Sequence, residues 1–170
     1  MPCPQCQAMT KNGTKCKLHT CKRYPYCWIH QRSVEGLEQK RSSIPDGGLG
    51  LFATRQFPYS KSRKMKPITY YSSKRISHHP NPNSEYVLKV NNKQYLDSED
   101  PSNFAGRYIN SFKHHPERAK RKANVRFTQG SRIYEKDNRF VVPIYQKKKI
   151  DKGEELFINY GNQYPIQRQI

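Results

Sequence analysis

The fold of this 170-residue chain is decided by the stretch Asn103-Phe104-Ala105-Gly106-Arg107-Tyr108-Ile109-Asn110-Ser111, which follows Leu96-Asp97. In the second part of the chain, residues 102–110 are the one candidate for a helix. Around it, short runs of β-forming residues alternate with turn residues, a pattern typical of strands. The expected strands are 51–54, 67–71, 85–90, 93–96, 132–135, 139–145 and 156–160. The second part is therefore predicted to be mostly β.

The sequence divides into three parts. Residues 1–32 are rich in Cys and His, residues 33–42 are polar and predict a linker or a short helical turn, and residues 43–170 hold the expected strands. Between two of those strands, Asn91-Asn92 predicts a two-residue hairpin turn, because asparagine tolerates a positive φ. The basic stretches 60–66 and 113–122 have no strand pattern and are expected to be surface loops.

Two further stretches flank this region. Gly47-Gly48-Leu49-Gly50-Leu51-Phe52-Ala53 precedes it, and its glycines allow the backbone to approach a ligand closely because no Cβ intervenes. Ile150-Asp151-Lys152-Gly153-Glu154-Glu155-Leu156-Phe157-Ile158-Asn159-Tyr160-Gly161 follows it. Gly-Glu-Glu-Leu alone is a common turn-to-strand sequence, and it becomes specific through its position downstream of 103–111.

In this order, the three stretches resemble the SET domain of protein lysine methyltransferases, over residues 44–164. The first is similar to the family's Gly-x-Gly-Leu/Val-Phe-Ala. The second, counted from Leu96-Asp97, is similar to Ile-Asp-Ala-x3-Gly-Asn-x-Ala-Arg-Phe-Ile-Asn-His-Ser, and the third to Ile-x-x-Gly-Glu-Glu-Leu-x-x-x-Tyr-Gly. The resemblance implies a SET-domain (β-clip) fold of short strands in small sheets. It also implies a C-terminal pseudoknot, a rare exception to the rule against threaded chains.

The resemblance further implies roles for individual residues. Tyr160 would be the catalytic tyrosine, Asn110 would bind the amino-acid end of S-adenosylmethionine, and the backbone of Ser111 would bind its adenine. The implied cofactor-binding set is Gly48, Leu49, Gly50, Arg107, Asn110, Ser111 and Tyr160. The implied walls of a lysine channel are Tyr71, Phe127 and Ile158. In the family, the position of Ile158 tunes the number of methyl groups, and a residue with no hydroxyl to hold a water favours di- or trimethylation.

Methyl transfer from a sulfonium to an amine needs a neutral amine. A free lysine has a pKa of ~10.4, so very little of it is deprotonated at pH 7. A narrow apolar channel lowers that pKa by desolvation, because burial disfavours the ammonium. Positioning of the two reacting groups supplies much of the acceleration that such sites achieve.

The sequence departs from the family pattern at several positions. Ser111 replaces the usual His, and Ser102 and Ser73 stand where glycine is usual. Main-chain contacts to adenine survive the change at Ser111, whereas side-chain stacking does not, so cofactor affinity is the property affected. The basic insert 113–122 also displaces Asn124 from its usual spacing. It is either a solvated loop or a surface that holds DNA or an acidic protein.

The first part of the chain carries the ligand types of a tetrahedral Cys3His zinc site, in the order Cys6, Cys16, Cys27 and His30. All five cysteines lie within the first 27 residues, and an odd number without a secretory segment argues for metal ligation rather than disulfides. So short a segment with few apolar residues needs the metal in order to fold. Cys3 can replace one of the four ligands, and His19 and Cys21 are surplus.

This segment also resembles a short module of large DNA virus proteins, Cys-x-Ala-x-Thr-x-x-Gly-x-x-Cys followed by Tyr-Cys-x-x-His. The corresponding residues are 6–16 and 26–30. The resemblance implies zinc binding and a viral origin, and it leaves the partner open.

The formal net charge of +19 is spread along the chain, with an excess of six basic residues in 1–42 and thirteen in 43–170. Such a charge attracts polyanions, which predicts contact with nucleic acid or nucleosomes, while solubility alone is the simpler explanation. The sequence has no run of about 18 apolar residues, so no membrane-spanning helix is predicted. The expected location is intracellular and nuclear, in the host nucleus or the virion for a viral protein.

Three functions are compatible with these features. An S-adenosylmethionine-dependent methyltransferase acting on a histone or another chromatin-associated protein accounts for the motifs and the charge. A catalytically inactive SET scaffold that binds chromatin or nucleic acid accounts for Ser111 and Ser73. A virion protein that condenses DNA accounts for the charge only. Since a basic enzyme repels basic histone tails, nucleosomes, in which DNA bridges the two, are favoured over free histones as substrate.

Overall fold

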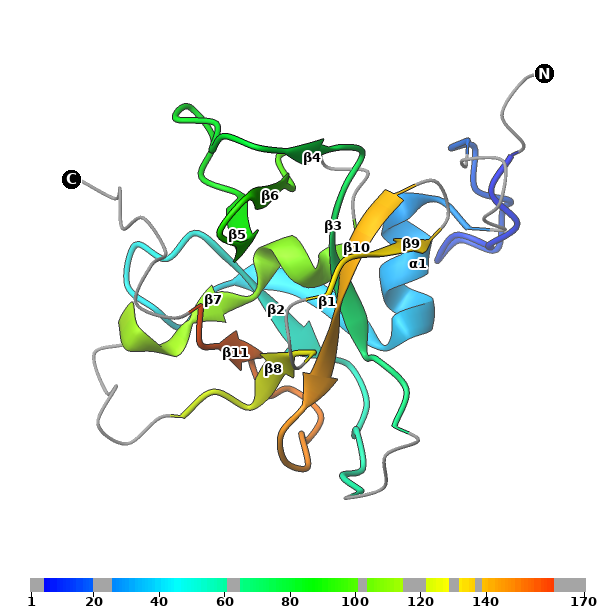
Figure 1. Cartoon of the computed structure of the whole chain (residues 1–170). Coiled ribbons are helices and arrows are strands. Elements are labelled where there is room, and N and C mark those ends of the chain that lie inside the picture. Colours follow the sequence, from blue (N-terminus) through cyan, green and yellow to red (C-terminus); the bar gives the residue numbers. More distant parts are fainter. Residues whose placement is uncertain are drawn as a thin grey trace.

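The computed structural model describes residues 5–19, 26–60, 65–100, 104–114, 122–128, 132–136 and 139–160. Short strands dominate these ranges, and they are grouped in small separate sheets (Figure 1). The prediction of a mostly β fold is confirmed. The helical elements among the described residues are α1 (Trp28–Glu35) and two 3-10 turns, η1 (Ala105–Tyr108) and η2 (Phe112–His114). None of the helices in the described ranges is long and apolar enough to cross a membrane.

The first sheet is a two-stranded antiparallel ribbon of β1 (Leu37–Arg41) and β2 (Leu49–Ala53). The segment 33–42, expected to be a linker or a short helical turn, therefore holds the end of α1 and the whole of β1. Leu37 explains the difference, since it pairs with Ala53 and is buried in the main core. The sequence of β1 is mostly polar, so its strand conformation depends on pairing with β2 rather than on its own composition.

The central sheet has the order β3 (Thr69–Ser73), β10 (Arg139–Gln146), β8 (Val125–Phe127), and β9 (Tyr134–Lys136) also pairs with β10. Its buried side chains include Tyr71, Val142 and Ile144, which belong to the same core as Leu37 and Leu51. The α1 helix is tied to this sheet by a hydrogen bond of 3.1 Å from the Thr69 hydroxyl to the Glu35 carboxylate. The Cys/His part of the chain thus continues directly into the larger domain.

A third sheet contains β4 (Ile76–Ser77), β6 (Gln94–Asp97) and β5 (Val87–Asn91). The hairpin expected between β5 and β6 is present, but its turn is Asn92-Lys93, because Asn91 pairs with Gln94. The expected positive φ is absent as well, since Asp46 is the one non-glycine residue with positive φ in the described ranges. The Asn91 side chain instead stabilises the turn by accepting a hydrogen bond of 2.9 Å from the backbone N–H of Lys93.

The fourth sheet joins two segments far apart in sequence. β7 (Asn110–Ser111) and β11 (Phe157–Ile158) run parallel, with Phe157 opposite Asn110 and Ile158 opposite Ser111. On its other side, β11 is bonded to Asn124, which donates from its backbone N–H to the Phe157 carbonyl and accepts from the Phe157 N–H at 2.8 Å. Figure 1 shows β11 lying between β7 and β8. This passage of the C-terminal strand between two earlier segments is the arrangement that a pseudoknot requires.

Candidate functional site

The stretches 103–111 and 150–161 meet at the hydroxyl of Tyr160. It donates a hydrogen bond of 2.8 Å to the backbone carbonyl of Ile109, the residue before Asn110. Tyr160 follows β11, whose parallel pairing with β7 brings the two segments together. The ring of Phe127, from β8, lies 5.7 Å from the half-buried Tyr160 ring, centroid to centroid. Tyr160 is therefore fixed at both its hydroxyl and its ring.

Asn110 connects this point to the glycine-rich turn. Its amide donates a hydrogen bond of 3.0 Å to the backbone carbonyl of Leu49. Gly48 has a φ of 64°, a conformation that glycine adopts readily, and a Cβ there would meet no atom within 4 Å. The side chain of Leu49 is 47% exposed. An open stretch of backbone next to an amide side chain fits the amino-acid end of S-adenosylmethionine.

Gly50 has a different environment from Gly48. A Cβ on Gly50 would collide with the carboxylate of Glu155 and lie 2.9 Å from its Cδ. Glu155 is only 4% exposed, and it accepts hydrogen bonds from both hydroxyls of Ser42 and Ser43 and from the Ser43 backbone. The absence of a Cβ at Gly50 therefore makes room for Glu155, which joins the turn before β2 to the segment that leads to Tyr160.

Two of the predicted channel residues are deeply buried. Tyr71 is 1% exposed, donates a hydrogen bond of 2.6 Å to the Tyr86 carbonyl, and packs edge-on against Phe127 at 6.3 Å. Ile158 is also 1% exposed and lies opposite Ser111. Phe127 is half-buried, so it connects the buried Tyr71 with Tyr160. The structure thus brings the aromatic residues of the predicted channel into one contiguous row.

Arg107 is placed against other partners. Its guanidinium lies 3.9 Å from the centroid of the Tyr86 ring, and Nη1 donates to the carbonyl of Glu99. The residue is 9% exposed, and its Nε has no hydrogen-bond partner among the described residues. These contacts tie η1 to the β5–β6 sheet. The structure therefore shows Arg107 packed against the segments that flank β5 and β6.

Several residues of the motifs lie outside the described ranges. They include one of the positions that depart from the family pattern, two of the additional cysteines of the Cys/His part, and most of the basic insert. These residues are Cys3, Cys21, Ser102, Asn103, Gly161 and the stretch 115–121.

The sequence alone did not indicate the roles of Asn124 and Glu155. Asn124 is 2% exposed, and its amide donates to the carboxylate of Glu154 at 3.1 Å and to the carbonyl of Glu155 at 2.8 Å. Both residues hold β11 in place rather than line an open surface. The available signal was the Gly-Glu-Glu-Leu sequence, which places an acidic residue immediately before a buried strand, where a charge needs polar partners.

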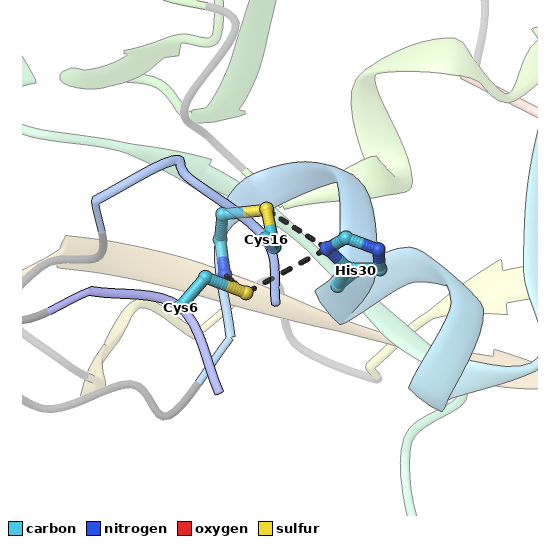
Figure 2. Close-up of side chains that lie close together, drawn as sticks. Cys6, Cys16 and His30 are labelled. Atoms are coloured by element: carbon cyan, nitrogen blue, oxygen red, sulfur yellow. Dashed lines mark hydrogen bonds between the residues drawn. The ribbon is translucent and has the colours of Figure 1, made fainter. Parts of the chain in front are cut away.

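A second cluster lies in the Cys/His part. The ligand atoms of Cys6, Cys16, Cys27 and His30 all lie within 4.8 Å of one another. Cys6 Sγ is 3.6 Å from His30 Nδ1, and Cys27 Sγ is 3.3 Å from it. Around one tetrahedral zinc ion, ligand atoms at 2.0–2.3 Å from the metal stand roughly 3.5–3.8 Å apart. Figure 2 shows the sulfur of Cys6 turned toward the imidazole of His30. The cluster therefore fits a zinc ion.

The protonation of these thiols suits a metal site. Burial raises the pKa of Cys6, but hydrogen bonds from the backbone of Cys27 and Ala8 and from the side chains of Cys27 and His30 outweigh it and bring the pKa down to about 7. Burial raises the pKa of the neighbouring Cys27 thiol. A cluster that stabilises one thiolate before any metal is bound favours cation binding, since zinc takes cysteine as thiolate. In Figure 1 the Cys/His part of the chain lies apart from β7 and β11.

Comparison with known proteins gives the chain a family. A protein-family model described as SET domain matches residues 48–161. Comparison with curated protein sequences finds no match. Among solved structures, the chain is similar to a chain of the Chaetomium thermophilum polycomb repressive complex 2, at 20% identity and a TM-score of 0.51 over 79% of this chain. It is similar to a chain of an active polycomb repressive complex 2 in the stimulated state, at 20% identity and a TM-score of 0.50 over 78% of this chain.

The two structural matches span 16% of the length of those polycomb chains, and at this identity they show a shared fold. The match to the family model establishes family membership as well as fold, because it covers more than half of the chain. It runs from the turn at Gly48 to the residue after Tyr160. It includes the paired strands β7 and β11 and the Asn110–Leu49 contact. The chain belongs to the SET-domain family, whose members are in general protein lysine methyltransferases.

Proposed function

We propose that this chain is an S-adenosylmethionine-dependent protein-lysine N-methyltransferase with Tyr160 as its catalytic tyrosine. The observation that carries the proposal is the hydrogen bond of 2.8 Å between the Tyr160 hydroxyl and the Ile109 carbonyl. It places a fixed hydroxyl one residue from Asn110, which is itself bonded to the open turn at Leu49. A hydroxyl and a cofactor-binding amide on adjoining segments are what the reaction needs.

When bound, the cofactor would supply an electrophilic methyl group on a sulfonium. The amine nitrogen would bond to that methyl carbon in line as the C–S bond breaks and a neutral thioether leaves. The Tyr160 hydroxyl donates a hydrogen bond to the Ile109 carbonyl, and its oxygen can also act as a hydrogen-bond acceptor. It can accept an N–H of the target amine and so fix the direction of the nitrogen lone pair. The amine releases its own proton to water beforehand, and the ring of Phe127 beside Tyr160 disfavours the ammonium by desolvation.

The cofactor-binding set divides into two groups. The residues that would contact the cofactor are Gly48, Leu49, Asn110, Ser111 and Tyr160, with Ser111 acting through its backbone. Gly50 and Arg107 would act from behind, since Gly50 accommodates Glu155 and Arg107 stacks on Tyr86. Ile158 and Tyr71 would shape the lysine channel through Ser111 and Phe127, and a hydrocarbon at Ile158 favours di- or trimethylation. All of these assignments belong to the proposal.

The Cys3His cluster would hold a structural zinc ion. Its three cysteines are buried, and the polar, short segment around them has a separate small core composed of these cysteines with Ala8 and Tyr26 packed against them. A core of that size cannot offset the conformational entropy of ordering the segment. Metal ligation would supply the missing free energy and fix the start of α1.

The substrate would be a histone or another chromatin-associated protein, met in the nucleus, with nucleosomes favoured over free histones. The charge of the chain supports nucleosomes as substrate, because its net charge of +19 is attracted to the dense negative charge of the nucleosomal DNA. The polycomb complexes that contain similar chains are consistent with a chromatin setting. The proposal includes contact with nucleic acid through the basic surface.

Calorimetric titration with S-adenosylmethionine tests the cofactor part of the proposal. Wild-type protein should bind one equivalent, and Asn110→Ala should bind at least about tenfold more weakly, equivalent to the ~1.4 kcal/mol of one hydrogen bond in a partly buried site. Asn91→Ala, which removes an amide from a turn of the β5–β6 sheet, is the matched control and should bind as wild type does. Absence of any binding by the wild type would favour a catalytically inactive SET scaffold that binds chromatin.

A further inference from the structure

A group of cations lies at the edge of the central sheet where β10 ends and β8 begins. Gln146 of β10 pairs with Val125 of β8, and the next residue, Lys147, donates its backbone N–H to the Asn124 carbonyl at 2.8 Å. The connection from β10 to β11 therefore leaves the sheet beside the segment that enters β8. Six exposed cations of these two segments form what we call the basic rim: Lys122, Arg126, Lys147, Lys148, Lys149 and Lys152.

The basic rim is only partly neutralised. Lys148 pairs with Glu154 at 3.0 Å and Lys149 with Asp151 at 2.9 Å. Within the described ranges no ion pair involves the other four cations, which are Lys122, Arg126, Lys147 and Lys152. Arg126 lies over the ring of Tyr145, at 5.7 Å from its centroid, so its guanidinium is held near the sheet edge. The rim thus combines two paired cations with four available ones.

Arg126, the rim residue within β8, points away from Tyr160. Along β8, Val125 is buried, Arg126 is exposed, and Phe127 packs on the ring of Tyr160. Because successive side chains of a strand point to opposite faces, Arg126 projects on the face opposite to Phe127. A ligand bound to the rim would leave the Tyr160 side of β8 free for a protein substrate.

The composition of the rim favours nucleic acid over an acidic protein. Five of its six residues are lysines, and lysine is depleted in protein–protein interfaces, where aromatic and apolar anchors dominate. Interfaces with DNA are instead strongly positive and polar, and flexible cations suit a repeating phosphate backbone. We infer that the basic rim is the surface through which this chain binds the phosphate backbone of duplex DNA. The inference rests on the nucleic-acid contact proposed above and is independent of methyl transfer.

The test compares two triple variants with the same change in net charge. The rim variant is Arg126→Gln, Lys147→Gln, Lys152→Gln, and the control is Lys11→Gln, Lys17→Gln, Lys93→Gln, three exposed lysines away from β8 and β10. Binding of a fluorescent DNA duplex is measured by anisotropy over a range of salt concentrations. Each lost phosphate contact lowers the slope of log K against log salt by about 0.9, so the rim variant should lose roughly 2–3 in slope and at least about tenfold in affinity near 0.15 M salt.

The outcomes separate the possible explanations. The control variant should lose less than about one unit of slope, and equal losses in both variants would overturn the inference, because net charge alone would then set the affinity. A polyglutamate chain that displaces the duplex at equal charge concentration would also overturn it, in favour of an acidic protein partner. If the wild type binds no duplex at all, the nucleic-acid contact itself is wrong. Lys147→Gln, Lys152→Gln, which leaves Arg126 on Tyr145, checks that the effect does not come from disturbed packing, and it should retain about two thirds of the loss in slope.

Discussion

The carboxylate of Glu155 accepts a hydrogen bond of 2.6 Å from the hydroxyl of Ser43, a residue 112 positions earlier in the chain. Ser42 donates to the same carboxylate at 2.7 Å, and the Ser43 N–H at 2.9 Å. Glu155 stands immediately before Leu156 and β11, so this contact joins the turn that would hold the cofactor to the segment that carries Tyr160. A buried charge with three donors is a stable arrangement, whereas the donors without the charge are not.

Removal of Glu155 should therefore weaken the whole fold. Glu155→Ala should lower the free energy of unfolding by about 3 kcal/mol, since it leaves buried donors unsatisfied. Glu38→Ala is the control, because Glu38 pairs with Lys40 at the surface and such pairs contribute at most about 1 kcal/mol. Denaturant unfolding measures both. A change in Glu155→Ala no larger than in the control would contradict the role assigned to this residue.

Gly50 should be intolerant of a methyl group for the same reason. Gly50→Ala places a Cβ against the Glu155 carboxylate, so the carboxylate must move away from Ser42 and Ser43, at an expected cost of about 2–3 kcal/mol. In Gly48→Ala the added Cβ meets open space, and only the positive φ costs, about 1–2 kcal/mol. Thermal unfolding of the two variants should rank Gly50→Ala as the less stable. The reverse order would mean that Glu155 can reorient freely.

The stability of the chain should depend on pH through Glu154. Partial burial raises the pKa of Glu154, but hydrogen bonds from the Asn124 amide and from Lys148 outweigh it, and the pKa lies below its ordinary value of 4.5. A lowered pKa in the folded state means that the carboxylate stabilises the fold above pH 4.5, and that this contribution is lost as the pH falls through the folded-state pKa.

Unfolding of wild type and Glu154→Gln should therefore be compared by denaturant titration at several pH values. The wild type should be the more stable at pH 7, and the difference should narrow steadily below about pH 4.5. A difference that is constant from pH 7 to about pH 3 would show that ionisation of Glu154 does not matter to the fold.

Metal content should distinguish the candidate ligands. Wild-type protein should carry one zinc ion per chain, and Cys6→Ser or Cys16→Ser should lose it and unfold at a lower temperature. Cys3→Ser should keep the metal, because Cys6 already stands within ligand distance of His30. Metal analysis together with thermal unfolding checks this set. Loss of zinc in Cys3→Ser with retention in Cys6→Ser would replace Cys6 by Cys3 in the cluster.

Local patterns in the sequence predicted much of this structure. The alternating runs identified β3, β9 and β10 of the central sheet but not β8. The spacing of Cys27 and His30 predicted two side chains turned onto one metal ion. The order of the motifs predicted the family. These features are visible because the physical cause, period or ligand spacing, is local in sequence.

Other features depend on partners that sequence does not pair. β1 was missed because its polar residues become a strand only opposite β2, where Leu37 enters the core. The hairpin turn moved by one residue because the Asn91 side chain bonds the backbone of Lys93. The contacts of Glu155 with Ser42 and Ser43, and of Asn124 with β11, span tens of residues and leave no periodic pattern. Long-range polar contacts of this kind hold the site in place.

The most direct test of the central claim is transfer of labelled methyl from S-adenosylmethionine to lysine in nucleosomes, measured for wild type and Tyr160→Phe. Phenylalanine keeps the ring contact with Phe127 and removes only the hydroxyl bonded to Ile109. The account predicts transfer by the wild type and a fall of about 10²–10⁴-fold in Tyr160→Phe, with unfolding changed by about 1 kcal/mol at most. Transfer by Tyr160→Phe at the wild-type rate would contradict the assignment of Tyr160 as the catalytic tyrosine.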